Sequence, residues 1–193
     1  MNKIIGASIA ASIAVKQTIL ADLAFQQKIE QAAQSCIQTF RSGGKVLFCG
    51  NGGSAADAQH IAAELSGRFY TDRPPLYAEA LHVNSSYVTA VANDYGYDEV
   101  YARMLQAAGR PGDVLVAIST SGNSPNIVKT IDVAKQQGMT IIGMTGASGG
   151  KMRDLCTILL NVPSSDTPRI QESHILIGHI ICQIIESEMF EEG

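Results

Sequence analysis

The chain has 193 residues, of which 46% are hydrophobic and 17% charged. That length can bury a sizeable core but cannot supply two full-sized domains, so we expect one domain over residues 1–193. The net charge of −4, without a run of Lys or Arg, argues against direct binding of nucleic acid. The four cysteines lie in apolar segments without C-x-x-C spacing, which fits free thiols in a reducing cytoplasm.

The N-terminal region, residues 2–42, is predicted to form two helices with a break near 22–25. Lys3 and the apolar stretch 4–15 resemble a secretory signal peptide. Apolar residues nevertheless recur at helical spacing, at Ile5, Ile9, Ile13, Leu20 and Ala24. This periodicity favours an amphipathic packing helix over a cleaved signal. No uninterrupted apolar run reaches about 18 residues, so we expect no membrane-spanning segment.

From residue 45 onward, short apolar runs alternate with helical segments. The runs are 46–49, 78–81, 114–118, 140–145 and 157–162, and the helical segments are 55–65, 85–92, 99–108, 125–137 and about 169–190. Such alternation is typical of parallel strands joined by crossover helices, in a sheet buried on both faces. The sequence therefore predicts an α/β three-layer sandwich with a five-stranded parallel sheet over 44–193, preceded by a helical extension over 1–43.

A hydroxyl-rich loop follows the third apolar run and precedes Pro125, which suits the first turn of a helix. Its hydroxyl side chains are Ser119, Thr120, Ser121 and Ser124. Hydroxyl and amide donors at a helix N-terminus can hold a phosphate dianion without Lys or Arg. The segment is therefore a candidate phosphate site, although an ordinary capping turn has a similar composition.

A glycine-rich loop, Gly50-Asn51-Gly52-Gly53-Ser54, follows the first apolar run and opens a helix. It matches neither G-x-G-x-x-G nor the phosphate loop ending in G-K-[ST], which argues against a dinucleotide or a nucleoside triphosphate. The glycines suggest a backbone brought against a sugar, with Asn51 and Ser54 reaching its hydroxyls. Glycine-rich turns of this kind also occur without a ligand.

His60 and Glu64 lie four residues apart on one predicted helix, and Gln171 and His179 lie eight apart on the last helix. Facing one another, these pairs could hold Zn²⁺ or act as an acid and a base beside a substrate carbon. A His/Glu pair at this spacing is also common on solvated surfaces. We interpret His82 and His174, which have no obvious partner, as structural or peripheral.

Five separated motifs, in the same order, resemble those of the phosphoheptose isomerase family, whose members have the sugar isomerase (SIS) fold, a flavodoxin-like arrangement. They are Gly50–Arg68 with His60 and Glu64, Asn93-Asp94, Ile118–Ser124, Thr145-Gly146 before Gly149-Gly150, and Arg169-Ile-Gln171-Glu-x-His174 with His179. The resemblance implies an aldose–ketose isomerase that converts sedoheptulose 7-phosphate to D-glycero-D-manno-heptose 7-phosphate through an enediol. That reaction is an early step of ADP- or GDP-heptose biosynthesis, for lipopolysaccharide or other surface glycans.

The resemblance also implies roles for individual residues. Glu64 matches the family's base and His179 its acid, and one Zn²⁺ per subunit is expected on His60, Glu64, Gln171 and His179. Substrate contacts are expected from Asn51, Gly52, Gly53, Ser54, Glu64, Arg68, Asn93, Asp94, Ser119, Thr120, Ser121, Ser124 and Gln171. The expected assembly is a cytoplasmic homotetramer with active sites at subunit interfaces, bound neither to nucleic acid nor to a membrane.

The resemblance leaves one departure and two alternatives. Some members carry Asp directly before the Arg-Ile-Gln segment, whereas this chain has Pro168 there and its nearest acid is Asp166. One alternative is a non-catalytic SIS protein that binds the replication initiator, but such proteins lack the glutamate and second histidine that match Glu64 and His179. The other is an isomerase of a different sugar phosphate, because the phosphate loop and enediol chemistry do not specify the length of the sugar.

Overall fold

The computed structural model describes residues 2–190 and contains a five-stranded sheet in which all the strands run parallel. Its strands are β1 (Val46–Gly50), β2 (Ala78–Ala80), β3 (Val114–Ile118), β4 (Thr140–Thr145) and β5 (Ile158–Asn161). The order across the sheet is β2-β1-β3-β4-β5. Every residue of β1 and β3 is buried, which explains why these strands are continuous apolar runs. The predicted sheet is confirmed.

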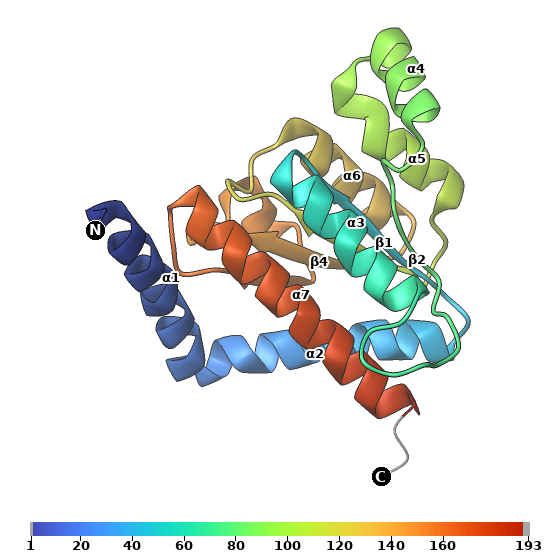
Figure 1. Ribbon diagram of the computed structural model, residues 1–193. Helices are drawn as coiled ribbons and strands as arrows, with labels where there is room; N and C mark the ends of the chain where they lie inside the picture. Colours follow the sequence, from blue (N-terminus) through green and yellow to red (C-terminus); the bar gives the residue numbers. More distant parts are fainter. Residues whose placement is uncertain (1, 191–193) are drawn as a thin grey trace.

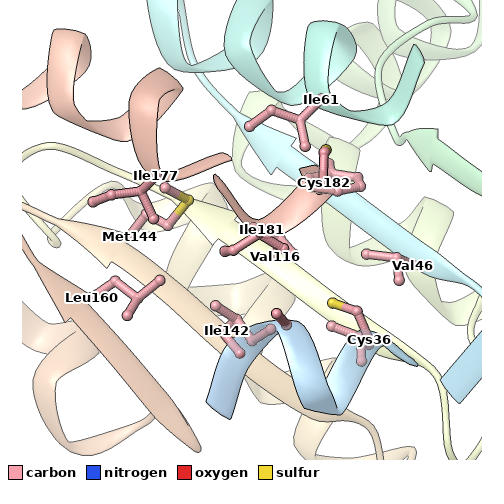
Figure 2. Packing of buried hydrophobic residues seen from close by; sticks show 14 of the residues in the cluster. Cys36, Val46, Ile61, Val116, Ile142, Met144, Leu160, Ile177, Ile181 and Cys182 are labelled. Atoms are coloured by element: carbon pink, nitrogen blue, oxygen red, sulfur yellow. The ribbon is translucent and has the colours of Figure 1, made fainter. Parts of the chain in front are cut away.

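Helices cover both faces of the sheet, as the three-layer prediction requires (Figure 1). One face packs against α2 (Leu23–Arg41), α3 (Gly53–Ser66) and α7 (Thr167–Phe190). The other face packs against α4 (Ser85–Tyr95), α5 (Val100–Ala108) and α6 (Pro125–Gln136). Figure 2 shows the first interface, where Cys36, Ile61 and Ile181 from the three helices meet strand residues such as Val116 and Ile142.

The two N-terminal helices behave differently. Asp22 separates α1 (Lys3–Ala21) from α2 and caps α2, because its side chain accepts a hydrogen bond from Phe25 N at 3.0 Å. The predicted break near 22–25 therefore has a physical cause. α2 lies under the sheet, whereas α1 extends along the outside of α7 and buries one residue, Ile19 (Figure 1).

α1 is also long and apolar enough to cross a membrane by length and composition, with a mean hydropathy of 1.6 over 18 residues. The expectation of no membrane-spanning segment was based on the length of uninterrupted apolar runs. Ser12, Lys16 and Gln17 interrupt those runs, but the mean hydropathy of the whole helix stays high. A packing helix with an apolar outer face meets the same criterion. The exposed side chains on α1 include Ile4, Ile5, Ile9 and Ile13.

Two short 3₁₀ helices complete the described chain. They are η1 (Tyr97–Glu99), directly before α5, and η2 (Gly150–Asp154), between β4 and β5. The carboxyl ends of the parallel strands all point to one edge of the sheet. The glycine-rich loop after β1 and the hydroxyl-rich loop after β3 therefore meet at that edge, beside the start of α7.

Candidate functional site

The glycine-rich loop brings α3 close to α7. Gly52 has φ of +56°, a backbone conformation that favours glycine, and α3 begins at the next residue. Gly53 faces the Gln171 side chain of α7, so a Cβ atom at Gly53 would come within 2.5 Å of Gln171 Nε2. The predicted sugar-binding glycines and Gln171 are thus adjacent, and the absence of a side chain at Gly53 permits the approach.

His60, Glu64 and His179 form a compact cluster between α3 and α7. His60 Nε2 lies 3.0 Å from Glu64 Oε1 and 3.1 Å from His179 Nε2. The His60 side chain is 50% exposed and that of Glu64 26% exposed, so a ligand can reach both from solvent. The ring of Phe69 lies against His179, with 5.7 Å between the ring centroids. The predicted pairing of the two helices through these residues is present in the structure.

The cluster has the spacing of a metal site. One ligand atom from each of His60, Glu64 and His179 lies within 4.8 Å of the other two. Tetrahedral Zn²⁺ with bonds of about 2.0–2.1 Å holds its ligand atoms roughly 3.3 Å apart, close to the 3.0 and 3.1 Å found here. Two imidazoles and a carboxylate also suit a divalent metal chemically. Gln171 as a fourth ligand remains a prediction, because its described neighbour is Gly53.

Asp57, which the sequence interpretation did not single out, lies on α3 one turn before His60. Burial raises the pKa of its carboxyl, while His60 and His179 oppose that shift. Its Oδ2 atom is buried and makes no hydrogen bond within residues 2–190. The i,i+3 spacing to His60 was the available signal for its proximity to the cluster.

The hydroxyl-rich loop forms hydrogen bonds within itself and with the loop that follows β4. Ser119 Oγ and Ser124 Oγ lie 3.0 Å apart, and Gly146 N donates to Thr120 O at 2.9 Å. Gly122 adopts φ of +67° and packs closely on Gly149. A Cβ atom at Gly122 would collide with the backbone of Gly149. A cavity of about 260 Å³ adjoins the loop, and its polar lining includes Thr120, Ser121, Ser164, Ser165 and Thr167.

Three of those lining residues, Ser164, Ser165 and Thr167, were not predicted as site residues. They belong to the loop after β5 and to the first residue of α7. Their position after a parallel strand was the signal that could have identified them, since every such loop lies at the ligand edge of the sheet. The cavity therefore has hydroxyl groups on two sides, a lining that suits a polyhydroxylated or phosphorylated ligand.

Two asparagine side chains join the glycine-rich loop to the first turn of α6. Asn51 Nδ2 donates to Asn126 Oδ1, and Asn126 Nδ2 donates to Asn51 Oδ1, both at 2.9 Å. Tyr97 OH also donates to Asn51 Oδ1 at 3.3 Å. The Asn51 side chain, which we expected to reach sugar hydroxyls, thus connects the glycine-rich loop to the first turn of α6. Asn126 was not predicted, because nothing in the local sequence indicates a partner 75 residues away.

The remaining predicted residues are less tightly grouped. Asn93 and Asp94 lie exposed at the end of α4, where Asn93 Nδ2 donates to Asp94 Oδ1 at 2.9 Å. Figure 1 shows α4 at the far side of α5 from the sheet. Arg68 is exposed in the loop that follows α3. Within residues 2–190 these three residues form no hydrogen bond or ion pair with His60, Glu64 or His179.

The other two histidines are packed within the fold. His174 is fully buried, and its Nε2 lies 3.1 Å from the carbonyl oxygen of Thr145. Burial lowers the pKa of His174 to about 4, and the Thr145 carbonyl opposes that shift. His82 packs edge-on against Tyr101, with 6.2 Å between the rings, and burial also lowers its pKa. Both contacts agree with the structural interpretation of these residues.

Known proteins agree with the fold. The SIS domain family model matches residues 10–146. The phosphoheptose isomerase of Aneurinibacillus thermoaerophilus is 53% identical over 190 residues, which are 98% of this chain and 96% of the relative. A solved phosphoheptose isomerase from Francisella tularensis has a TM-score of 0.92 at 38% identity, covering 97% of this chain and 100% of the other.

A second solved phosphoheptose isomerase, from Neisseria gonorrhoeae, has a TM-score of 0.88 at 45% identity and covers 95% of this chain and 97% of the other. The parallel α/β fold and the extent of these matches define an isomerase of the SIS class. The chain belongs to the SIS domain family and, within it, to the phosphoheptose isomerases. The resemblance seen in the sequence is thereby confirmed.

Proposed function

We propose that this enzyme interconverts sedoheptulose 7-phosphate and D-glycero-D-manno-heptose 7-phosphate. The observation that supports the proposal is the cluster of His60, Glu64 and His179, in which a carboxylate oxygen and two imidazole nitrogens lie within 4.8 Å of one another and could act on one substrate carbon. Relatives about half identical to this chain over nearly its full length have the name phosphoheptose isomerase. The product would supply heptose for lipopolysaccharide or another surface glycan, and the enzyme would work in the cytoplasm.

The chemistry is a proton transfer between two adjacent carbons. Glu64 removes the proton from one carbon and returns it to the other, because its carboxylate is exposed enough to meet substrate yet partly shielded from water. His179 donates and accepts protons at the two sugar oxygens as the enediol forms and collapses. A Zn²⁺ ion held by His60, Glu64, His179 and Gln171 would supply positive charge that stabilises an enediolate.

The substrate is held at both ends in this proposal. Ser119, Thr120, Ser121 and Ser124 would donate hydrogen bonds to the phosphate at the start of α6. The glycine-rich loop at 51–54, together with Arg68 and Gln171, would hold the sugar between the phosphate and the cluster. Some family members have an Asp where this chain has Pro168, and Asp166 is the nearest acid. Asp166 is exposed near the start of α7, and its carboxylate forms no hydrogen bond within residues 2–190.

A homotetramer is part of the proposal, with residues 1–43 as its packing extension and 44–193 as the α/β core of a single domain. α1 exposes Ile4 at 71% and Ile9 at 57%, a pattern unsuited to a free surface in water. A groove of about 750 Å³ between α1, α2 and α7 is lined by Leu20, Leu23, Leu176, Ile180 and Ile184 among others. Neighbouring subunits would cover both surfaces.

The same assembly gives a role to Asn93 and Asp94. Both residues are exposed on α4 of a single subunit. They would contact substrate if the active site of a neighbouring subunit lies against α4. Light scattering of the purified protein tests the assembly. A monomer would contradict it and would leave these two residues outside any site.

One assay separates the candidate activities. The protein is incubated with sedoheptulose 7-phosphate and, separately, with pentose and hexose phosphates, and the aldose and ketose forms are measured. Preferential turnover of the heptulose phosphate supports the proposal. Turnover of a shorter sugar phosphate would identify another isomerase, and turnover of none would favour the initiator-binding alternative despite Glu64 and His179.

A further inference from the structure

A buried carboxylate near the end of α7 collects hydrogen bonds from the loop that follows α3. Glu186 Oε1 accepts from Tyr70 N at 2.7 Å and Thr71 N at 2.9 Å. Glu186 Oε2 accepts from Phe69 N at 3.2 Å and Arg73 Nε at 3.1 Å. The side chains of Glu186 and Arg73 are each 2% exposed. The carboxylate therefore has two donors on each oxygen and fixes the loop against α7.

Arg73 uses its other nitrogens to hold the end of α3. Its Nη2 donates to Glu64 O and its Nη1 to Leu65 O, both at 2.8 Å. These carbonyls belong to the last turn of α3, where a helix supplies no partner of its own for them; Leu65 O also accepts from Leu76 N at 3.1 Å. The guanidinium thus donates to two carbonyls at the C-terminal end of α3 and joins that end to Glu186 on α7. Figure 1 shows this loop passing beside the C-terminal half of α7.

Arg73 and Glu186 each bond to the backbone of a residue at or beside a candidate catalytic group. Arg73 holds the backbone of Glu64 itself. Glu186 holds the backbone of Phe69, whose ring lies 5.7 Å from the His179 ring. One buried ion pair therefore connects the backbone of Glu64 with that of Phe69, the residue whose ring lies beside His179.

We propose that Arg73 and Glu186 are positioning residues that set the distance and orientation of Glu64 relative to His179. The inference deepens the isomerase function proposed above. A buried ion pair is a poor source of stability, because desolvation offsets most of the attraction between its charges. A fully hydrogen-bonded network does, however, restrict the arrangement of the groups that it joins. Positioning of the two helices is consistent with that property.

The chain contains a matched control. Asp113 is also a buried carboxylate, 3% exposed, and accepts from Lys45 Nζ at 2.6 Å, Lys45 N at 3.0 Å and Arg110 N at 2.8 Å. It precedes β3, so it lies at the edge of the sheet opposite the site. Asp113→Asn and Glu186→Gln therefore make the same chemical change in similar surroundings, and only Glu186 is connected to the cluster.

The test compares these two variants with the unchanged protein. For Glu186→Gln we expect kcat to fall about 10- to 100-fold with little change in KM, because a displacement near 1 Å affects the reacting groups more than the distant phosphate loop. Asp113→Asn should lower thermal stability but leave kcat near that of the unchanged protein. Equal losses of kcat in the two variants, or no loss in Glu186→Gln, would overturn the proposal.

A second readout does not depend on activity. Proton–carbon-13 correlation spectra of the aromatic side chains report the C–H groups of the His179 ring, whose chemical shifts should depend on the Phe69 ring 5.7 Å away. These resonances should move in Glu186→Gln and stay in place in Asp113→Asn. If the unchanged protein isomerises no heptose phosphate, the proposed function fails while this measurement still decides the positioning role. Should Glu186→Gln not fold, Arg73→Lys tests the same point, since lysine keeps the charge but cannot reach Glu186 and both carbonyls together.

Discussion

Glu64 has two predicted roles, as base and as metal ligand, and its replacement tests the first. Glu64→Gln keeps the shape of the side chain but removes the basic carboxylate, so kcat should fall at least about 100-fold while phosphate affinity is retained. Steady-state kinetics with sedoheptulose 7-phosphate, and inorganic phosphate as a competitive inhibitor, measure both. A variant that turns over near the original rate would leave His179 as the candidate base.

His60 lies between the other two members of the cluster and is best suited to test metal binding. His60→Ala removes one imidazole from a site with ligand atoms 3.0 and 3.1 Å apart, so bound zinc should be lost. Gln171→Glu should bind zinc more tightly, because a carboxylate is a stronger ligand than an amide oxygen.

Calorimetric titration of metal-free protein with zinc measures both variants. His82→Ala is the control, since His82 packs on Tyr101 away from the cluster. If the unchanged protein does not bind zinc and keeps full activity in chelator, the cluster is an acid/base site alone.

At the scale of elements, the loop between β3 and α6 carries the predicted phosphate contacts. Ser119→Ala and Ser121→Ala each remove a hydroxyl donor, which should cost about 1–3 kcal/mol and raise KM roughly 5- to 150-fold. Ser119 is buried beside Ser124, whereas Ser121 is turned toward Asn123 N at 3.2 Å.

Ser35→Ala is a suitable control, because that hydroxyl bonds within α2 to Gln31 O at 2.9 Å. KM values measured for all three variants provide the comparison. An unchanged KM in both loop variants would remove this loop from the phosphate site.

The elements themselves were largely predictable. Strands buried on both faces consist of continuous apolar residues, and Gly, Pro and Asp mark the ends of helices, so β1, β3 and α6 followed from the sequence. The contacts that organise the site were not predictable in the same way. Asn126 meets Asn51 across 75 residues, and Glu186 lies in the charged sequence Glu186-Ser187-Glu188, which is typical of a solvated helix end. Only the three-dimensional fold shows that Glu186 is buried and Glu188 is not.

At the scale of the whole molecule, we expect His174 to make stability depend on pH. Burial lowers its pKa to about 4 in the folded chain, against 6.5 when unfolded. Between pH 6.5 and about 4, His174 is therefore protonated in the unfolded chain but not in the folded chain. The free energy of unfolding should decrease as the pH falls through this interval. At pH 5 the loss from this group should be about 2 kcal/mol relative to neutral pH.

Urea unfolding of the original protein and of His174→Gln, at pH 7.5 and pH 5, measures this contribution. Glutamine does not titrate and can still donate to Thr145 O, so the variant should lose less stability on acidification. Other groups titrate in both proteins and cancel in the difference. A parallel loss in the two proteins would show that His174 does not cause the pH dependence.

The strand order has a consequence for how the specificity of this enzyme could change. β1 and β3 are adjacent, but the helices that follow them, α3 and α6, cover opposite faces of the sheet. Their first turns therefore diverge from this point, which is where open parallel α/β sheets bind their ligands. The proposed base and acid, Glu64 and His179, lie on α3 and α7, whereas Ser164 and Ser165 lie on a separate loop. Because Ser164 and Ser165 share a cavity with Thr120 and Ser121, exchanging or lengthening that loop should change the space offered to the substrate while Glu64 and His179 stay on their helices.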